Sequence, residues 1–162
     1  MITIHKAKVE EVAEIKKLLF ETWTSTYSKI YSHEAIRIIT SEWHSIKLLT
    51  KQIKDSSSCF IVAKEGAKIV GMCNAALTPE GAIINIQRLH VLPQYQRQGI
   101  GSKLINEVTK AFLKIHKISL EVEKQNHNAF AFYKRHGYKE TGGKVFIIEN
   151  IKIPCIVMEK VV

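Results

Sequence analysis

The most informative stretch of the chain spans residues 88–102 and reads Arg88-Leu89-His90-Val91-Leu92-Pro93-Gln94-Tyr95-Gln96-Arg97-Gln98-Gly99-Ile100-Gly101-Ser102. Its first residues predict a strand, and Pro93 ends strand pairing and directs the chain into a loop. Gly99 and Gly101 then remove side chains at the entrance of a helix, where a ligand could meet the backbone. A helix N-terminus offers free N–H groups and partial positive charge, which suit phosphate, and Arg97 adds a fixed positive charge. We therefore expect an anion-binding loop at this helix entrance.

Two known kinds of phosphate-binding loop do not fit this stretch. A P-loop needs the pattern G-x-x-x-x-G-K-[ST], which the chain lacks. A dinucleotide fingerprint needs a third small residue after G-x-G-x-x, but position 104 is Leu. Two glycines alone could form no more than a turn. The complete run of strand, Pro93, Tyr95-Gln96 and Gly99-x-Gly101 before a helix favours a bound ligand.

Outward from this stretch, hydrophobic periodicity predicts one mixed α/β (α+β) domain over residues 1–162. The expected strands cover Ile2–His5, Cys59–Ala63, Ile69–Leu77, Ala82–Val91, Ile118–Val122, Val145–Ile148 and Ile153–Glu159. A turn at Glu65–Lys68 joins the second and third of these into a hairpin. The expected helices cover Val9–Thr22, His33–Lys54 with a break near Thr40–Ser41, Gly99–His116, and Asn128–His136, which Gly137 ends.

Composition and charge narrow the class of protein further. A hydrophobic fraction of 46% over 162 residues is normal for a globular chain and too high for a disordered one. The chain opens without a signal segment and has no run near the roughly 20 apolar residues of a membrane span. We therefore expect a cytoplasmic protein without membrane contact. Residues 1–80 hold 11 basic and 9 acidic side chains, residues 81–162 hold 13 and 6, and the positive second half suits an anionic partner.

The three cysteines indicate neither a metal site nor a disulfide. Cys59, Cys73 and Cys155 form no C-x-x-C pair, and their number is odd. Cys59 and Cys73 also lie in apolar, strand-like runs. We expect buried free thiols and no bound metal.

A second motif follows the expected strand Ile118–Val122. It reads Asn126-x-x-Ala129-x-x-Phe132-Tyr133-x-x-x-Gly137-Tyr138, and positions 126, 129, 130 and 133 share one face of a helix. This motif resembles the N-x-x-A-x-x-F-Y-x-x-x-G-F/Y pattern of the GNAT superfamily of N-acetyltransferases. Gln96-Arg97-Gln98-Gly99-Ile100-Gly101 resembles the Q/R-x-x-G-x-G/A signature of the same family. The two motifs stand in the family's order, and the element order agrees along nearly the whole chain.

The resemblance implies a fold, a co-substrate and a set of contacts. The fold would be a mostly antiparallel central sheet of about seven strands flanked by about four helices. Acetyl-CoA would be the co-substrate, held by Leu89, His90, Val91, Arg97, Gln98, Gly99, Ile100, Gly101, Ser102, Asn126 and Tyr133. The strand residues 89–91 would pair with the pantetheine arm, residues 97–102 would wrap the pyrophosphate, and Asn126 would hydrogen-bond the arm. Tyr133 would act as the general acid beside the sulfur.

These contacts suggest a direct transfer in which a neutral amine attacks the thioester carbonyl. A backbone N–H around residues 89–91 would stabilise the oxyanion, and Tyr133 would protonate the leaving thiolate. The general base stays open. Asn85 stands where many relatives have Glu, and neither Asn85 nor Gln87 can usefully take a proton. His90 titrates in a suitable range but could equally be an imidazole packed on the sheet, and a water chain would need no residue at all.

The acceptor side is expected between the first two helices. Its candidate residues are Trp23, Tyr27, Tyr31 and Glu34, because ring faces and a carboxylate could hold a cationic amine. Trp23 and Tyr27 could instead be core aromatics at i, i+4, and Glu34 could simply favour the start of a helix. The pattern from Trp23 to Glu34 and the ending Val157–Lys160 resemble PaiA-like polyamine acetyltransferases. Protein N-termini, including those of basic ribosomal proteins, aminoglycosides and amino-acid amines stay open as acceptors.

Two other classes of function remain beside an acetyltransferase. The first is a module that binds and senses acyl-CoA without catalysis, which the missing Glu at position 85 would suit. The second is a nucleic-acid-binding domain, which only the charge suggests and for which the chain has no recognition motif. We therefore expect acetyl-CoA and an amine as partners and no nucleic acid, and a homodimer is compatible with this interpretation.

Overall fold

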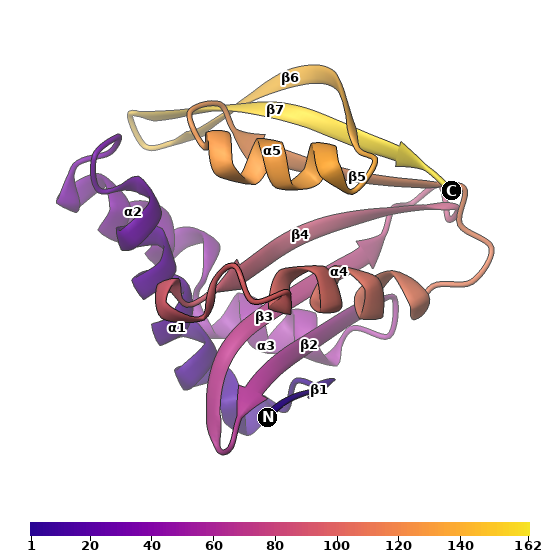
Figure 1. Ribbon diagram of the computed structural model, residues 1–162. Helices are drawn as coiled ribbons and strands as arrows, with labels where there is room; N and C mark the ends of the chain where they lie inside the picture. Colours follow the sequence, from indigo (N-terminus) through magenta and orange to yellow (C-terminus); the bar gives the residue numbers. More distant parts are fainter.

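The computed structural model describes residues 1–162 and contains one seven-stranded sheet in the order β1-β2-β3-β4-β5-β7-β6 (Figure 1). The strands are β1 (Ile2–Lys6), β2 (Ser58–Glu65), β3 (Lys68–Leu77), β4 (Ile83–Val91), β5 (Lys117–Glu123), β6 (Lys139–Ile148) and β7 (Ile151–Val161). All neighbouring pairs are antiparallel except β4–β5, which is parallel. The expected mixed, mostly antiparallel fold is confirmed.

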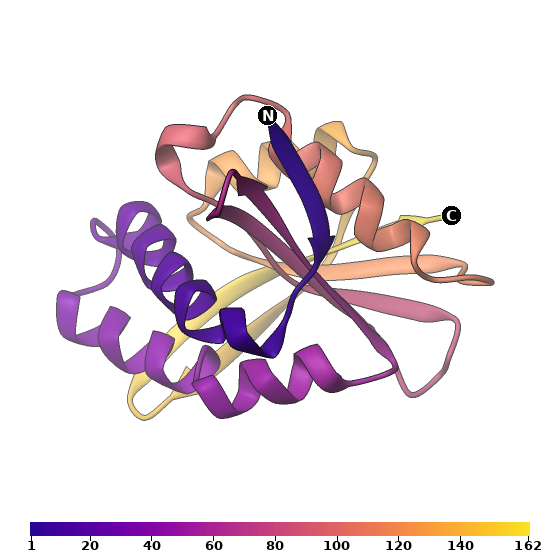
Figure 2. The same ribbon diagram turned by 90° about the horizontal axis from the view of Figure 1, so that it is seen from below.

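Helices cover both faces of this sheet (Figures 1 and 2). One face carries α1 (Val12–Tyr27), α2 (His33–Trp43) and α3 (Ile46–Lys54), and the opposite face carries α4 (Ile100–Lys110) and α5 (His127–Arg135). Two single 3-10 turns, η1 (Val9–Glu11) and η2 (Pro93–Tyr95), precede α1 and α4. The sheet is therefore the middle of three layers, and segments from both outer layers can reach its centre.

The parallel pair β4–β5 separates part-way along the sheet. Pairing runs only from Ile83 opposite Lys117 to Ile86 opposite Leu120. Beyond this point β4 stays paired with β3 up to Val91, and β5 stays paired with β7 up to Glu123. The divergence is visible in Figure 1, where β4 turns away from β5 and β7. It leaves the backbone of residues 87–91 without a strand partner on the β5 side.

Two apolar clusters stabilise the layers. The larger cluster packs α1, α4 and the central strands around side chains that are fully buried, such as Leu19, Met72, Leu104 and Met158. The smaller cluster joins the end of α1 to α2 and the β6–β7 hairpin through Trp23, Tyr27, Ile36, Ile39, Ile148, Ile153 and Cys155. Because Trp23 and Tyr27 are buried here, they have the core role that i, i+4 aromatics usually have. The smaller cluster positions the α1–α2 loop over the open end of the sheet.

The helix boundaries differ from those expected in three places. α1 continues five residues beyond Thr22, because the buried Trp23 and Tyr27 extend its apolar face. The break in the second helical segment falls at His44–Ser45 and not at Thr40–Ser41. Thr40 and Ser41 stay within α2, and their hydroxyls donate to the carbonyls of Ile36 and Ile38, at 2.8 and 2.9 Å, so they do not cap a new helix. Ser45 instead caps a new helix, which brings the α-helices to five.

The third difference is the end of α4, which stops at Lys110, six residues before the expected end. Phe112 and Ile115 continue to pack on the core from the loop that follows, so their spacing resembled a helix without forming one. The Glu65–Lys68 hairpin turn and the left-handed Gly137 after α5 are confirmed, the latter at φ +92°. Cys59, Cys73 and Cys155 are confirmed as buried free thiols. No helix is long and apolar enough to cross a membrane.

Candidate active site

The entrance of α4 forms the loop that the sequence indicated. Arg97 and Gly99 both have left-handed backbone, with φ of +61° and +82°. Gly99 is the N-cap and no side chain caps the helix, so its first N–H groups keep no protein partner. The Gln96 side-chain amide closes the loop by donating to the carbonyl of Val91 at 2.8 Å. Residues 96–99 are exposed, and this arrangement fits an anionic group placed against the helix entrance.

The second motif packs directly beside this entrance. A Cβ placed on Gly101 would lie 3.5 Å from the ring of Phe132, so α4 and α5 approach closely here. The Ser102 hydroxyl donates to Nε2 of His136 at 3.0 Å, because the other ring nitrogen of His136 donates to the carbonyl of Phe132. The structure thus brings together the two motifs, which are separated by about one strand in the sequence.

The end of β4 supplies an open backbone edge next to the same entrance. Leu89, His90 and Val91 pair with Cys73, Met72 and Gly71 of β3, and their other edge has no strand partner, although the Val91 carbonyl accepts from the Gln96 side chain. An unpaired strand edge presents free N–H and C=O groups to a ligand. The predicted contacts of residues 89–91 and 97–102 therefore lie on one continuous stretch of accessible backbone.

Tyr133 is buried in the middle of α5. Its ring lies 5.5 Å from that of Tyr138, and its hydroxyl makes no hydrogen bond to the protein. Burial, with smaller contributions from Cys73, Tyr138 and Tyr27, raises the pKa of Tyr133 well above its usual value of 10. The phenol therefore keeps its proton at neutral pH.

The Asn126 side chain caps α5 and also links this helix to α1. Its side-chain oxygen accepts from the N–H of Ala129 at 3.1 Å and so caps α5. Its amide donates to the Tyr27 hydroxyl at 3.1 Å and so ties the N-terminus of α5 to α1. Burial raises the pKa of Tyr27 to about 12. The second amide proton of Asn126 has no protein acceptor.

Three of the four predicted acceptor-side residues come together at the end of α1. The Trp23 ring lies 4.2 Å from that of Tyr27 and 6.4 Å from that of Tyr31, and Tyr27 and Tyr31 are 6.0 Å apart. Glu34 does not join them, because it is exposed on the first turn of α2 and pairs with Arg37. The carboxylate beside the aromatic rings is Glu123 at the end of β5, which accepts a hydrogen bond from the Tyr31 hydroxyl.

His90 adopts the packed arrangement that was one of its two interpretations. Its Nδ1 donates to the Thr22 hydroxyl at 3.0 Å, since that hydroxyl already donates to the carbonyl of Leu19. Burial, followed by the positive charge of Arg88, lowers the pKa of His90 to about 3. An imidazole with that pKa is a weak proton acceptor at neutral pH.

A buried polar network holds the neighbouring part of β4. The Arg88 guanidinium donates to Nδ1 of His44, to the side chains of Gln52 and Asn74, and to the carbonyl of Trp43. Burial lowers the pKa of Arg88 to about 10, so it stays charged at neutral pH. The network connects the α2–α3 junction to β4, the strand that carries His90. It therefore stabilises the position of β4 beside the α4 entrance.

Two carboxylates near the open end of the sheet were missed from the sequence. Glu121 lies on β5 beside Asn85, whose side-chain amide approaches it at 3.4 Å, and Lys144 of β6 is 3.8 Å away. Glu123 is two residues further on the same face of β5. The carboxylate beside Asn85 of β4 is thus Glu121, which comes from the neighbouring strand β5. The only available signal was the alternation of Glu121 and Glu123 with buried apolar residues, which does not reveal which strand they face.

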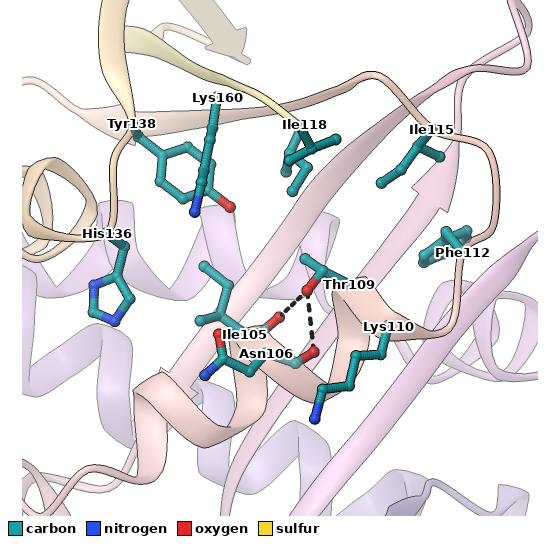
Figure 3. Close-up of a pocket in the computed structure, with 11 residues that line it drawn as sticks. Ile105, Asn106, Thr109, Lys110, Phe112, Ile115, Ile118, His136, Tyr138 and Lys160 are labelled. Atoms are coloured by element: carbon teal, nitrogen blue, oxygen red, sulfur yellow. Dashed lines mark hydrogen bonds between the residues drawn. The ribbon is translucent and has the colours of Figure 1, made fainter.

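Two lysines lie at the edge of a hollow of about 270 Å³ between the C-terminal half of α4 and strands β5 and β7 (Figure 3). Lys110 comes from α4 and Lys160 from β7, and the Lys160 amine lies 5.8 Å from the centre of the Tyr138 ring. Apolar side chains such as Ile105 and Ile118 form the rest of the wall. Lys110 pairs with Glu107 at 3.1 Å, so Lys160 is the lysine here that adds uncompensated positive charge, which favours the approach of an anionic co-substrate.

Comparison with known proteins agrees with this geometry. Residues 13–138 match the acetyltransferase (GNAT) family. The chain belongs to that family. It is 30% identical over 157 residues to a spermidine N(1)-acetyltransferase of Thermoplasma acidophilum, which covers 92% of this chain and 96% of the relative. An N-alpha-acetyltransferase of Sulfurisphaera tokodaii is 27% identical over 120 residues, or 64% of this chain and 70% of that protein.

A solved structure shares the whole fold. The PaiA N-acetyltransferase from Thermoplasma acidophilum, determined in complex with coenzyme A, superposes with a TM-score of 0.89 at 26% identity. The alignment covers 100% of this chain and 99% of that one. This GNAT protein is thus an N-acetyltransferase that uses acetyl-CoA, and the likeness to the PaiA branch is confirmed. The uncapped entrance of α4 and the free edge of β4 fit that co-substrate.

Proposed function

We propose that this GNAT enzyme transfers the acetyl group of acetyl-CoA to a primary amine of a polyamine, with Tyr133 as general acid. One observation carries the proposal. The uncapped entrance of α4 continues into the free edge of β4, and the partner-free hydroxyl of Tyr133 belongs to the helix packed against that entrance. A phosphate-binding group, a strand-like binding edge and a proton donor are thus available to one extended co-substrate.

The chain's own residues would share the work as follows. The first N–H groups of α4 and the Arg97 guanidinium hold the pyrophosphate. Residues 89–91 pair with the pantetheine arm as an added strand would, and Asn126 has one amide proton left to offer it. This binding fixes the thioester at the point where β4 and β5 separate.

In the transfer, the amine nitrogen attacks the carbonyl carbon and the carbon–sulfur bond breaks. A backbone N–H of residues 89–91 stabilises the negative charge that develops on the carbonyl oxygen. Tyr133 then gives its proton to the sulfur of the leaving group. The attacking nitrogen releases its extra proton to water, and the Tyr133 phenolate takes a proton back from solvent, so the amide and CoA thiol leave a restored enzyme. The phenol is protonated at neutral pH when the thioester binds, since burial raises the pKa of Tyr133 above its usual value.

The acceptor side favours a cationic amine. Trp23, Tyr27 and Tyr31 gather three aromatic rings beside the carboxylate of Glu123. Ring faces and a carboxylate are the groups that bind ammonium ions in proteins. The relative that is 30% identical is named for spermidine, which is a polyamine of this kind.

The test is a thiol-release assay with acetyl-CoA and a panel of acceptors. The panel holds spermidine, 1,4-diaminobutane, an aminoglycoside and a peptide with a free N-terminus. We expect the polyamines to give the highest kcat/KM. Preferential use of the peptide would overturn the polyamine assignment, and CoA binding without thiol release from any acceptor would support the sensing module instead.

A further inference from the structure

The Glu123 carboxylate is a buried charged group without a positive partner. Glu123 is 5% exposed, and the buried charged residues of the chain are Glu123 and Arg88. Arg88 uses its guanidinium on several neutral acceptors, whereas Glu123 forms no salt bridge with any cation. A buried carboxylate without a cation is costly, because it has lost its water and gained no opposite charge.

Hydrogen bonding compensates this charge only in part. One carboxylate oxygen accepts from the backbone N–H of Gln125 and the other from the Tyr31 hydroxyl, both at 2.5 Å. An ionised carboxylate can accept about four hydrogen bonds, so roughly half its capacity is unused. Neither donor is charged. The carboxylate can therefore accept further hydrogen bonds, and its negative charge has no positive partner. A positively charged donor would supply both.

The position of Glu123 relates this deficit to the reaction. Its strand has already separated from β4, since pairing between the two ends at Leu120. Tyr31 reaches Glu123 from the α1–α2 loop, across 92 residues of sequence. Tyr27, beside Tyr31, is bonded to Asn126 at the start of α5. Glu123 thus lies between the aromatic rings and the helix that carries Tyr133.

We propose that Glu123 and Tyr31 form a subsite for a second, non-reacting ammonium group of the acceptor, so that the enzyme selects amines with at least two positive charges. This inference rests on the proposed function and assigns the acceptor its class. The reacting nitrogen is neutral when it attacks, and the charged nitrogen elsewhere in the molecule binds at Glu123.

Binding occurs by exchange of donors. The N–H of the ammonium group replaces the O–H of Tyr31 on the carboxylate, so the number of hydrogen bonds is kept and the missing positive charge is supplied. Tyr31 lies in the short loop between α1 and α2, outside both helices. The Tyr31 ring then lies beside the bound cation, and it packs against the buried rings of Trp23 and Tyr27. A neutral tail at this position would leave Glu123 as it is and gain neither contact.

The first test compares acceptors of equal length that differ by one charge, namely 1,4-diaminobutane and 1-aminopentane, in which a methyl group takes the place of the second amino group. The wild-type enzyme should have a KM at least about tenfold lower for the diamine, the size expected for a charged hydrogen bond. Equal KM values for the two amines would overturn the proposal without any variant.

The second test replaces the carboxylate. Glu123→Gln keeps the side-chain shape and should raise the diamine KM at least about tenfold, while the monoamine KM stays within about twofold. Glu140→Gln, at an exposed position of β6, is the matched control and should change neither. A Glu123→Gln effect of equal size on both amines would refute the subsite. Thermal unfolding and CoA binding verify that each variant is folded.

The third test separates exchange of donors from simple support. Tyr31→Phe keeps the ring and removes the competing hydroxyl, so the diamine KM should fall. A rise in that KM would show that Tyr31 only props the site. Calorimetric binding of spermidine to the CoA-loaded protein, wild type against Glu123→Gln, decides the inference separately from turnover. Spermidine binding that depends on Glu123 would support the subsite even if no amine were acetylated, in which case the proposed function alone would fail.

Discussion

Replacing Gly99 with Ala tests whether the entrance of α4 binds the co-substrate. Gly99 has φ of +82°, which residues with a side chain rarely adopt. A Cβ at this position would meet no atom within 4 Å, so the whole effect of the substitution comes from the backbone. Forcing Ala into this conformation costs about 1–2 kcal/mol.

The loop can escape this cost by turning to a negative φ. Residues 96–99 are exposed, and no side chain caps α4, so little holds Gly99 in its present conformation. After relaxation the first N–H groups of α4 no longer converge, and co-substrate binding must restore them. The restoring energy of about 1–2 kcal/mol should raise the KM for acetyl-CoA about 5–30-fold.

Gly81→Ala is the matched control. Gly81 has φ of +86° and equally open surroundings, but it precedes β4 whereas Gly99 follows it, about 30 Å away along nine strand residues. Both variants should lower Tm by less than the roughly 2–4 °C per kcal/mol that unrelieved strain would cost, because each exposed turn can relax, and only Gly99→Ala should change the KM for acetyl-CoA. Steady-state thiol release and thermal unfolding measure the two effects. If Gly99→Ala kept the wild-type KM for acetyl-CoA, the helix entrance would not be the binding group.

Three further substitutions address other parts of the site. Tyr133→Phe should lower kcat by roughly 10²–10⁴ and leave CoA affinity nearly unchanged, because the ring is kept and only the proton is lost; an unaltered kcat would exclude the general-acid role. Glu34→Ala should leave the acceptor KM within about twofold, because Glu34 pairs with Arg37 at the surface, and a larger change would restore it to the acceptor side. His90 has a folded-state pKa lowered to about 3, so between pH 6.5 and 3 only the unfolded chain binds its proton, and stability falls as pH falls through that window. Denaturant unfolding at pH 7 to 4 should show a shallower decline for His90→Asn, by up to about 1.4 kcal/mol per pH unit, and parallel curves would contradict the burial of a neutral imidazole.

The order of elements was predictable because each depends on local pattern. The spacing of apolar residues alone predicts α4, and the turn at Gly66 between two apolar runs alone predicts the β2–β3 hairpin. The predicted helix boundaries were wrong where tertiary contacts outweigh the local helix propensity of the residues. α1 passes through a run rich in Thr, a poor helix former, because burial of Trp23 and Tyr27 against α2 compensates. The break after α2 lies at Ser45, whose hydroxyl accepts from the N–H of Leu48, and not at the equally polar Thr40.

The two halves of the active site differ in how far a sequence reveals them. The proposed co-substrate side consists mainly of backbone groups, so its sequence signals are glycine, proline and their spacing within residues 93–101. The acceptor side is built from side chains that meet across the fold, as Tyr31 and Glu123 do across 92 residues. Which carboxylate faces the aromatic rings depends on where β5 separates from β4, and alternation along β5 cannot show that point. Glu34, nearer in sequence, was therefore the natural choice and lies elsewhere.

Acceptor preference can change separately from co-substrate binding, because the two sides of the site use different kinds of groups. The contacts that we propose for the pyrophosphate and the pantetheine arm involve few side chains, so we expect substitutions around Tyr31 and Glu123 to leave them in place. Neither residue contributes to the larger apolar cluster, and Glu123 ends its strand where pairing with β4 has already stopped. The α1–α2 loop and the last residues of β5 can therefore vary together, with the charge at position 123 deciding whether a cationic or a neutral tail is accepted. Restoring charge balance at Glu123 by a bound ammonium ion thus links acceptor choice to one buried carboxylate and leaves the transfer machinery unchanged.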